Sequence, residues 1–147
     1  YKSVFLIVIG ISAASLLAAL IAEAFLGLEP CQLCIYQRWP FAIVIVLGLL
    51  GLALRHNPKI ASSAMALSGL ALLINSGIAF YHTGVELHWW KSAVDGCLVP
   101  MMSGEKQSIL ENIMSAPTGR CDEIPWSDPI LGLSMANYNV MLCLGLA

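Results

Sequence analysis

The chain has 147 residues, of which 59% are hydrophobic and only 11% are charged. Ordinary soluble domains carry about 25% charged residues, and a single soluble domain could not bury this much apolar surface. The formal net charge is −2 and the seven Lys and Arg residues are scattered, so no basic patch indicates a nucleic-acid partner. Composition therefore excludes a nucleic-acid-binding protein and favours a membrane protein.

Uncharged apolar blocks predict four membrane helices. About 20 helical residues cross the hydrocarbon core, and a helix satisfies its own backbone hydrogen bonds in lipid. The first block is too long for a secretory signal and lacks a small-residue cleavage site, so we expect a retained anchor. We predict an all-α membrane protein, a four-helix bundle forming one domain over residues 1–147, with spans at about 4–26, 35–54, 60–80 and 131–147.

Charged residues and prolines separate the predicted spans. Glu29-Pro30 ends the first span, and the Arg-His-Asn-Pro-Lys run at residues 55–59 ends the second, because these residues cannot continue a membrane helix. The third span is rich in small residues, which let neighbouring helices approach closely. The fourth stops inside an apolar run, so we expect it to continue past the end of the chain.

Two loops, at about 27–34 and 81–130, fall on the same side of the predicted bundle. Within the long loop, four apolar residues share one helical face and predict a short helix lying on the membrane surface: Ile109, Leu110, Ile113 and Met114. A count of Lys and Arg does not decide the orientation. The dense positive charge at residues 55–59 favours termini on the inner side of the membrane and the two loops on the outer side.

Four of the five cysteines fall in these two loops: Cys31 and Cys34 in the short one, Cys97 and Cys121 in the long one. Four thiols facing one compartment indicate disulfide chemistry in an oxidising space or a metal site. A zinc site commonly uses two close pairs of ligands, whereas only Cys31 and Cys34 have CxxC spacing. We therefore favour redox chemistry without a metal. A zinc-stabilised membrane scaffold is the alternative, and Cys143 is expected to be a packing residue.

The CxxC pair stands where the second span begins. Unpaired backbone N–H groups and the positive end of the helix dipole stabilise a thiolate, which we expect at Cys34, with Arg38 adding a cation one turn further on. An arginine in a membrane helix needs a partner, such as this thiolate or a carbonyl oxygen of a ligand. No GxGxxG or P-loop is present, so a lipid-dissolved quinone is the expected electron acceptor.

Other polar and aromatic residues near the span ends have weaker functional interpretations. His82 follows the third span and could hydrogen-bond a quinone carbonyl or relay a proton, although interfacial placement is an equal interpretation. For His88, Trp89 and Trp90 we favour anchoring at the membrane interface. Glu23 is expected to reach the lipid headgroups.

The run from Glu29 to Arg38, Glu-Pro-Cys-Gln-Leu-Cys-Ile-Tyr-Gln-Arg, resembles the signature of the DsbB family, disulfide bond formation protein B, a quinone-linked oxidase of the bacterial periplasm. Similar runs follow at Tyr81-His82-Thr83, at residues 84–90 ahead of Cys97, and at Gly119-Arg120-Cys121. The likeness covers essentially the whole chain. It disfavours the vitamin K epoxide reductase type, which is the nearest rival within redox chemistry.

The resemblance implies a protein-dithiol:quinone oxidoreductase of the bacterial inner membrane. A thioredoxin-like partner of the DsbA type would attack the Cys97/Cys121 disulfide at Cys97. Cys121 would then attack Cys31. Cys34 would pass the electrons to ubiquinone or menaquinone, bound with the help of Arg38 and His82.

Overall fold

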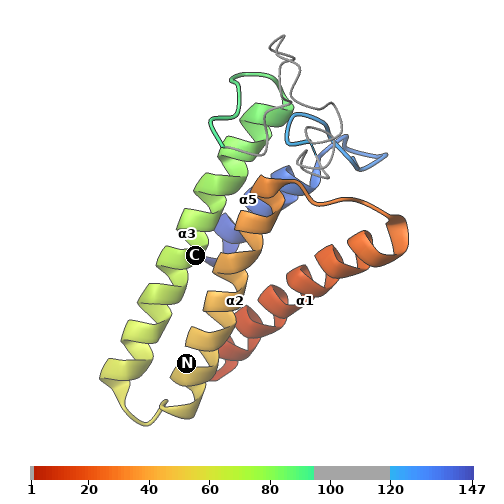
Figure 1. Ribbon diagram of the computed structural model, residues 1–147. Helices are drawn as coiled ribbons and strands as arrows, with labels where there is room; N and C mark the ends of the chain where they lie inside the picture. Colours follow the sequence, from red (N-terminus) through yellow and green to blue (C-terminus); the bar gives the residue numbers. More distant parts are fainter. Residues whose placement is uncertain (1, 95–119) are drawn as a thin grey trace, which may run out of the picture.

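The computed structural model describes residues 2–94 and 120–147, which form four helices (Figure 1). These are α1 (Lys2–Leu26), α2 (Gln32–Ala53), α3 (Pro58–Glu86) and α5 (Met135–Leu146). Within the described residues no strand forms beyond one isolated bridge between Ser127 and Ser134. The predicted all-α architecture is confirmed. The predicted surface helix near residues 109–114 lies outside the described residues, as does Cys97.

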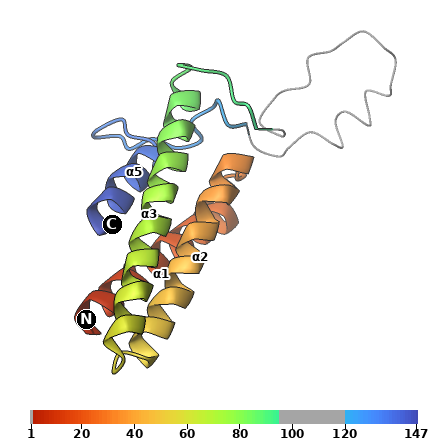
Figure 2. The same cartoon turned by 90° about the vertical axis from the view of Figure 1, so that its left-hand side faces the viewer.

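The helices pack side by side, with α2 between α1 and α3, and with α5 against α3 (Figures 1 and 2). In Figure 1, α1 diverges from α2 toward its Leu26 end, and the linker to α2 crosses the opening. α5 ends about halfway along α3, where the carbonyl of Ala147 lies 3.3 Å from the position that a Cβ on Gly69 would occupy. The diverging end of α1 contributes to the lining of the cavity described below.

Three of the helices, α1, α2 and α3, are long and apolar enough to cross a membrane, and α5 is a shorter apolar helix. Its 12 residues rise about 18 Å, less than the hydrocarbon thickness of about 30 Å. It begins later than the predicted residue 131, because Gly132 takes a left-handed conformation and Ser134 caps the helix through the N–H of Asn137. Because α1, α2 and α3 can each cross a bilayer, the chain is a helical membrane protein.

α3 continues to Glu86, six residues beyond the predicted end of the third span at residue 80. No proline or glycine pair interrupts this segment, and the helix stops only where His88 adopts a left-handed conformation with φ of 58°. The N–H of Trp89 bonds to the carbonyl of Gly84, and that of His88 to Val85, which is the Schellman arrangement. The prediction of a loop from residue 81 is corrected, and His82 and Glu86 stand on a rigid helix.

The segment after α3 folds back onto the helix. Trp90 donates from Nε1 to the carbonyl of Tyr81 at 3.2 Å, and its ring stacks on the Tyr81 ring with centroids 5.9 Å apart. The indole lies on Gly84, where a Cβ would come within 2.1 Å of the ring. Because glycine alone leaves this space, the aromatic residues cover the end of α3.

The core joins all four described helices. Its main cluster contains Val8, Phe41, Val44, Leu72 and Cys143, which come from α1, α2, α3 and α5. A second cluster contains Phe5, Ala61 and Ala64 and lies near the turn between α2 and α3. The small side chains of Ala61 and Ala64 on α3 leave room there for the Phe5 ring of α1, and small residues are common where helices pack within a membrane.

We predict that Gly51→Ala destabilises the bundle. Its new Cβ would lie 2.4 Å from the Phe5 ring, which is only 1% exposed and has no room to move, so overpacking should cost about 1–3 kcal/mol. Denaturation of the detergent-solubilised protein measures this change. Gly77→Ala is the matched control, because nothing lies within 4 Å of its Cβ. Equal stability of the two variants would contradict the prediction.

Candidate functional site

The start of α2 brings the two cysteines of the CxxC motif together. Cys31 is the N-cap residue, and its Sγ accepts the backbone N–H of Cys34 at 3.3 Å. The two sulfur atoms lie 3.1 Å apart, and both cysteines are free thiols. The helix N-terminus thus stabilises negative charge on Cys31. The sequence-based placement of the thiolate at Cys34 is therefore corrected to Cys31 for the reduced pair.

His82, on α3, lies beside Cys31 with a defined ring orientation. Its Nε2 is 3.5 Å from Cys31 Sγ, and its Nδ1 is 2.9 Å from Nε2 of Gln37. An amide nitrogen only donates, so Nδ1 accepts and the ring proton resides on Nε2, directed toward Cys31. The orientation of the Gln37 amide is set in turn by Asn139, whose Nδ2 donates to Gln37 Oε1 at 2.6 Å.

The hydrogen-bond chain extends from Asn139 into the bundle. The Cys143 thiol donates to Asn139 Oδ1 at 3.2 Å, and Asn75 donates to Cys143 Sγ at 3.4 Å. Asn75 and Cys143 are fully buried. Cys143 therefore joins a polar network in addition to packing in the core, and the ring of His82 is oriented by residues from α2, α3 and α5.

The surroundings of Cys31 favour its thiolate. The contact with the Cys34 thiol, and after it the His82 imidazole, hold the pKa of Cys31 well below its usual range, although burial acts in the opposite direction. Cys31 is 4% exposed, so neither interaction is weakened by bulk water. The reduced pair thus consists of a thiolate at Cys31 and a thiol at Cys34.

A buried carboxyl group completes the inner part of the site. Glu86, one turn after His82 on α3, is 5% exposed. Its Oε2 accepts a hydrogen bond from Ser134 at 2.5 Å, and its Oε1 lies 3.7 Å from Nε2 of His82. The ring N–H of His82 thus has both Cys31 and Glu86 within reach.

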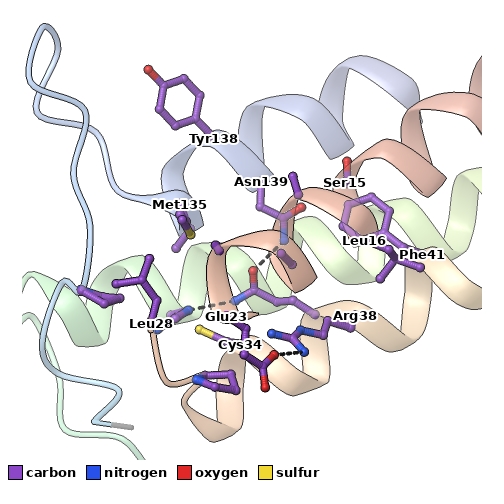
Figure 3. A pocket seen from close by; sticks show the side chains of 18 of the residues that line it. Ser15, Leu16, Glu23, Leu28, Cys34, Arg38, Phe41, Met135, Tyr138 and Asn139 are labelled. Carbon is purple, nitrogen blue, oxygen red and sulfur yellow. Dashed lines mark hydrogen bonds and ion pairs between the residues drawn. The ribbon is translucent and has the colours of Figure 1, made fainter. Parts of the chain in front are cut away.

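Arg38 is paired with an acid that we expected at the lipid headgroups. Its Nη1 donates to Oε2 of Glu23 on α1 at 2.9 Å, as Figure 3 shows. The side chains are 25% and 41% exposed, so this pair adds little to stability. Glu23 is thus the partner that Arg38 needs within a membrane helix. From the sequence we had expected this partner to be the Cys34 thiolate or a ligand.

A cavity of about 290 Å³ lies between α1, α2 and α5 (Figure 3). Apolar side chains form most of its lining, including Leu16, Phe41 and Leu142. Its polar residues include Cys34, Arg38, Glu23, His82 and Glu86. The cavity is near the lower limit of ligand pockets, about 300 Å³, and combines an apolar wall with a cation and a thiol.

A second cavity, of about 420 Å³, lies on the loop side of the cysteines. Cys31 lines this cavity only, whereas Cys34 and His82 line both cavities. The segment from Arg120 to Pro125 contributes much of the remaining wall. Cys34 is therefore at the junction between an apolar cavity among the helices and a more polar cavity beneath the long loop.

Cys121 lies in the same buried cluster as Cys31, Leu33 and Val85. It is fully buried and disulfide-bonded. Beside it, Arg120 donates to both Asp122 oxygens at 3.0 and 2.8 Å and pairs with Glu123 at 2.9 Å. The structure thus joins Cys31, Cys34, His82 and Cys121. The predicted Cys97/Cys121 pairing stays a prediction, since Cys97 lies outside the described residues.

The ligand atoms of Cys31, Cys34 and His82 lie within 4.8 Å of one another, so these residues could hold a soft metal ion. Two sulfurs bound to one tetrahedral zinc ion lie about 3.8 Å apart. The observed distance between them is 3.1 Å, so zinc binding requires the thiols to separate. The arrangement is closer to that of a pair ready to form a disulfide.

Sequence reasoning missed the supporting polar residues of the site, namely Gln37, Glu86, Ser134 and Asn139. Glu23 was noted but not paired with Arg38. The available signal was general: polar and ionisable side chains within apolar helices are costly and usually face one another or a cavity. Their pairing required the three-dimensional arrangement of α1, α2, α3 and α5.

Comparison with known proteins gives a family match over residues 1–147, to the family described as disulfide bond formation protein DsbB. The chain belongs to the DsbB family. Disulfide bond formation protein B of Xanthomonas campestris pv. campestris is 34% identical over 145 residues, which cover 93% of this chain and 81% of that protein. The protein of the same name from Dechloromonas aromatica is 31% identical over 134 residues, covering 84% and 74%.

No solved structure matches the chain significantly. Membership of the DsbB family, together with the apolar helices, makes this chain a disulfide-forming membrane protein. The family assignment agrees with the resemblance noted in the CxxC run. It also decides against the vitamin K epoxide reductase type.

We predict that Cys34→Ala raises the pKa of Cys31, because it removes the contact that lowers this pKa most. The ultraviolet absorbance of the thiolate, followed against pH, measures the shift, and Cys31→Ser should abolish the signal. With a lowered pKa, the thiolate stabilises the reduced fold above the ordinary thiol pKa of about 8.5. This stability is lost as the pH falls through the lowered pKa. Titration near pH 8.5 in the wild type would contradict the assignment.

Proposed function

We propose that this protein reoxidises a thioredoxin-like dithiol oxidase of the DsbA type and passes the electrons through Cys97/Cys121 and Cys31/Cys34 to a membrane quinone. The observation that carries the proposal is the position of Cys34 between the two cavities. One cavity suits exchange with cysteines of the long loop. The other suits an apolar electron acceptor.

Exchange begins on the loop side. A thiolate of the partner attacks Cys97, and the disulfide to Cys121 breaks, so that Cys121 leaves as a thiolate. The shared buried cluster of Cys121 and Cys31 supports the next step, in which Cys121 attacks the Cys31–Cys34 disulfide at Cys31. Cys121 belongs to the segment from Arg120 to Pro125, which lines the second cavity beside Cys31.

The attack on Cys31 transfers negative charge to Cys34. In the reduced pair the thiolate is on Cys31, but a mixed disulfide with Cys121 occupies that sulfur, and the leaving thiolate is then Cys34. Cys34 lines the apolar cavity, and Arg38 lies in the same lining. The second thiolate of the partner then closes the partner's disulfide and releases Cys97. Cys97 displaces Cys31 from Cys121, so that the Cys97/Cys121 disulfide forms again and the Cys31/Cys34 pair is left reduced beside the acceptor.

A quinone head group fits the chemistry of the apolar cavity. The lining is mostly apolar, and Arg38 and the Nε2–H of His82 are the donors that could reach carbonyl oxygens. Ubiquinone or menaquinone, dissolved in the bilayer, is the proposed substrate. The overall reaction balances, because partner dithiol plus quinone gives partner disulfide plus quinol.

This chemistry locates the cysteine loops in an oxidising compartment, since disulfides form and persist there. We therefore propose a multi-pass protein of the bacterial inner membrane with periplasmic cysteine loops and cytoplasmic termini. The single domain would cross the membrane with α1, α2 and α3, and α5 would form part of the proposed fourth span.

The reconstituted protein should oxidise a reduced thioredoxin-like partner only when quinone is supplied. Cys34→Ser should abolish turnover, because the thiolate that faces the acceptor is lost. Absorbance of the quinone measures the reaction. Gln32→Ser, between the two cysteines but outside both cavity linings, is the matched control and should retain activity.

Undiminished turnover in Cys34→Ser would overturn the proposed electron route. Tightly bound zinc, with thiols protected from alkylation and no reduction of quinone, would establish the zinc-stabilised scaffold instead. Metal analysis of the same preparation distinguishes these results.

Cys121→Ser should trap the partner. Without Cys121, the Cys97 thiolate attacks the disulfide of the oxidised partner and releases one partner thiolate. The resulting mixed disulfide should accumulate, because Cys121 is no longer present to displace the partner from Cys97. Non-reducing electrophoresis followed by mass spectrometry identifies the captured protein, which we expect to be a thioredoxin-like oxidase. Cys97→Ser should give no adduct, and an adduct that persists in that variant would count against Cys97 as the point of attack.

A further inference from the structure

Glu86 is a buried carboxyl group for which the electron route provides no role. It is 5% exposed, lines the apolar cavity and is held by Ser134 at the start of α5. Burial of an ionisable group is costly and is uncommon without a functional reason. Glu86 stands beside His82, with 3.7 Å between Oε1 and Nε2.

Reduction of a quinone requires two electrons and two protons, and the reduced cysteine pair supplies only one of these protons. Cys31 is a thiolate in that pair, and Cys34 is the thiol. Formation of the Cys31–Cys34 disulfide therefore releases two electrons and one proton. The second proton therefore comes from water or from another group that faces the apolar cavity.

The groups facing Glu86 limit the candidates for this donor. His82 faces it from the same helix, Cys31 and Cys34 from the start of α2, and Ser134 from the start of α5. Elsewhere in the cavity lining, Arg38 is paired with Glu23 and Tyr138 donates to Asp128. Glu29 also lines the cavity, but it is exposed, whereas Glu86 is buried. The Nδ1 of His82 is occupied by Gln37, so this ring carries its single proton on Nε2.

We propose that Glu86 supplies the second proton of quinol formation, an inference that rests on the proposed function. Protonated Glu86 gives its proton to the quinone oxygen within the apolar cavity and becomes a carboxylate. The Nε2–H of His82, which faces Cys31 Sγ and lies 3.7 Å from Glu86 Oε1, stays on the ring and stabilises this carboxylate. The carboxylate regains its proton from water that enters through the loop-side cavity, which His82 lines. The site thus takes electrons and protons by separate routes.

The test compares Glu86→Gln with the wild type in a single turnover. The full chain, with both cysteine pairs reduced, is mixed with an excess of a short-chain ubiquinone, and quinone absorbance is followed across a range of pH. Because protonated Glu86 is the donor, the wild-type rate should fall at alkaline pH. Glu86→Gln should be slower by about 10- to 100-fold and should lack this alkaline fall. Asp128→Asn removes a partly buried carboxylate that lines neither cavity, keeps an oxygen that can accept the Tyr138 hydroxyl, and should behave as the wild type.

A second reaction separates proton donation from a structural role. Without quinone, the oxidised protein exchanges disulfides with a reduced thioredoxin-like partner, and Glu86→Gln should do so at the wild-type rate. Equal losses in both reactions, or an unchanged rate and pH profile with quinone, would overturn the proposal. Failure of the wild type to reduce quinone would instead overturn the proposed function.

Ser134→Ala provides a second variant if Glu86→Gln does not fold. It leaves the carboxyl group in place and removes its hydrogen-bond donor. The alkaline fall in rate should persist but move along the pH axis, because a hydrogen bond to one protonation state biases the titration. An alkaline fall at the wild-type position would contradict the role of Glu86.

Discussion

The hydrogen bond from Gln37 to Nδ1 of His82 determines which atoms of the site can donate and which can accept. It places the ring proton on Nε2, facing Cys31 and Glu86, and it crosses from α2 to α3. Asn139 on α5 fixes the amide of Gln37, so three helices must be packed correctly before the imidazole is oriented. Within an apolar bundle each of these polar groups needs a partner, because lipid and packed side chains offer none. The same requirement that holds the helices together therefore defines the protonation pattern of the site.

Two polar groupings flank the CxxC pair and differ in their access to water. Arg38 and Glu23 form a partly exposed pair on one side of the apolar cavity. Glu86, His82 and Ser134 form a buried group on the other side. Cys34 lies between them, in the lining of both cavities. A charge that appears on Cys34 thus has a fixed cation nearby in the cavity lining, while the side chains of His82 and Glu86 are buried.

Much of the fold could be predicted from sequence, because membrane helices are determined by local composition. The starts and ends of α1 and α2 follow from apolar runs and from Pro30 and Pro58. The end of α3 could not be predicted in this way, since it depends on a left-handed His88 rather than on glycine or proline.

The cysteines of the site were recognisable by spacing. From the sequence we assigned the thiolate to Cys34, because the N-cap residue of α2 was not identified. In the structure that residue is Cys31. Partners such as Glu23 and Gln37 depend on tertiary packing, which spacing does not reveal.

The length of α3 links the site to the thickness of the surrounding bilayer. Its 29 residues extend about 43 Å, whereas the hydrocarbon layer is about 30 Å thick. If the Pro58 end lies at one boundary, the last two turns, which carry His82 and Glu86, rise into the headgroup layer. A thicker bilayer would draw these turns toward hydrocarbon or reduce the tilt of α3, and a thinner one would do the opposite. Lipid chain length is then a physical variable that acts on the hydration of the imidazole and the carboxyl group, without any change in the residues that contact them.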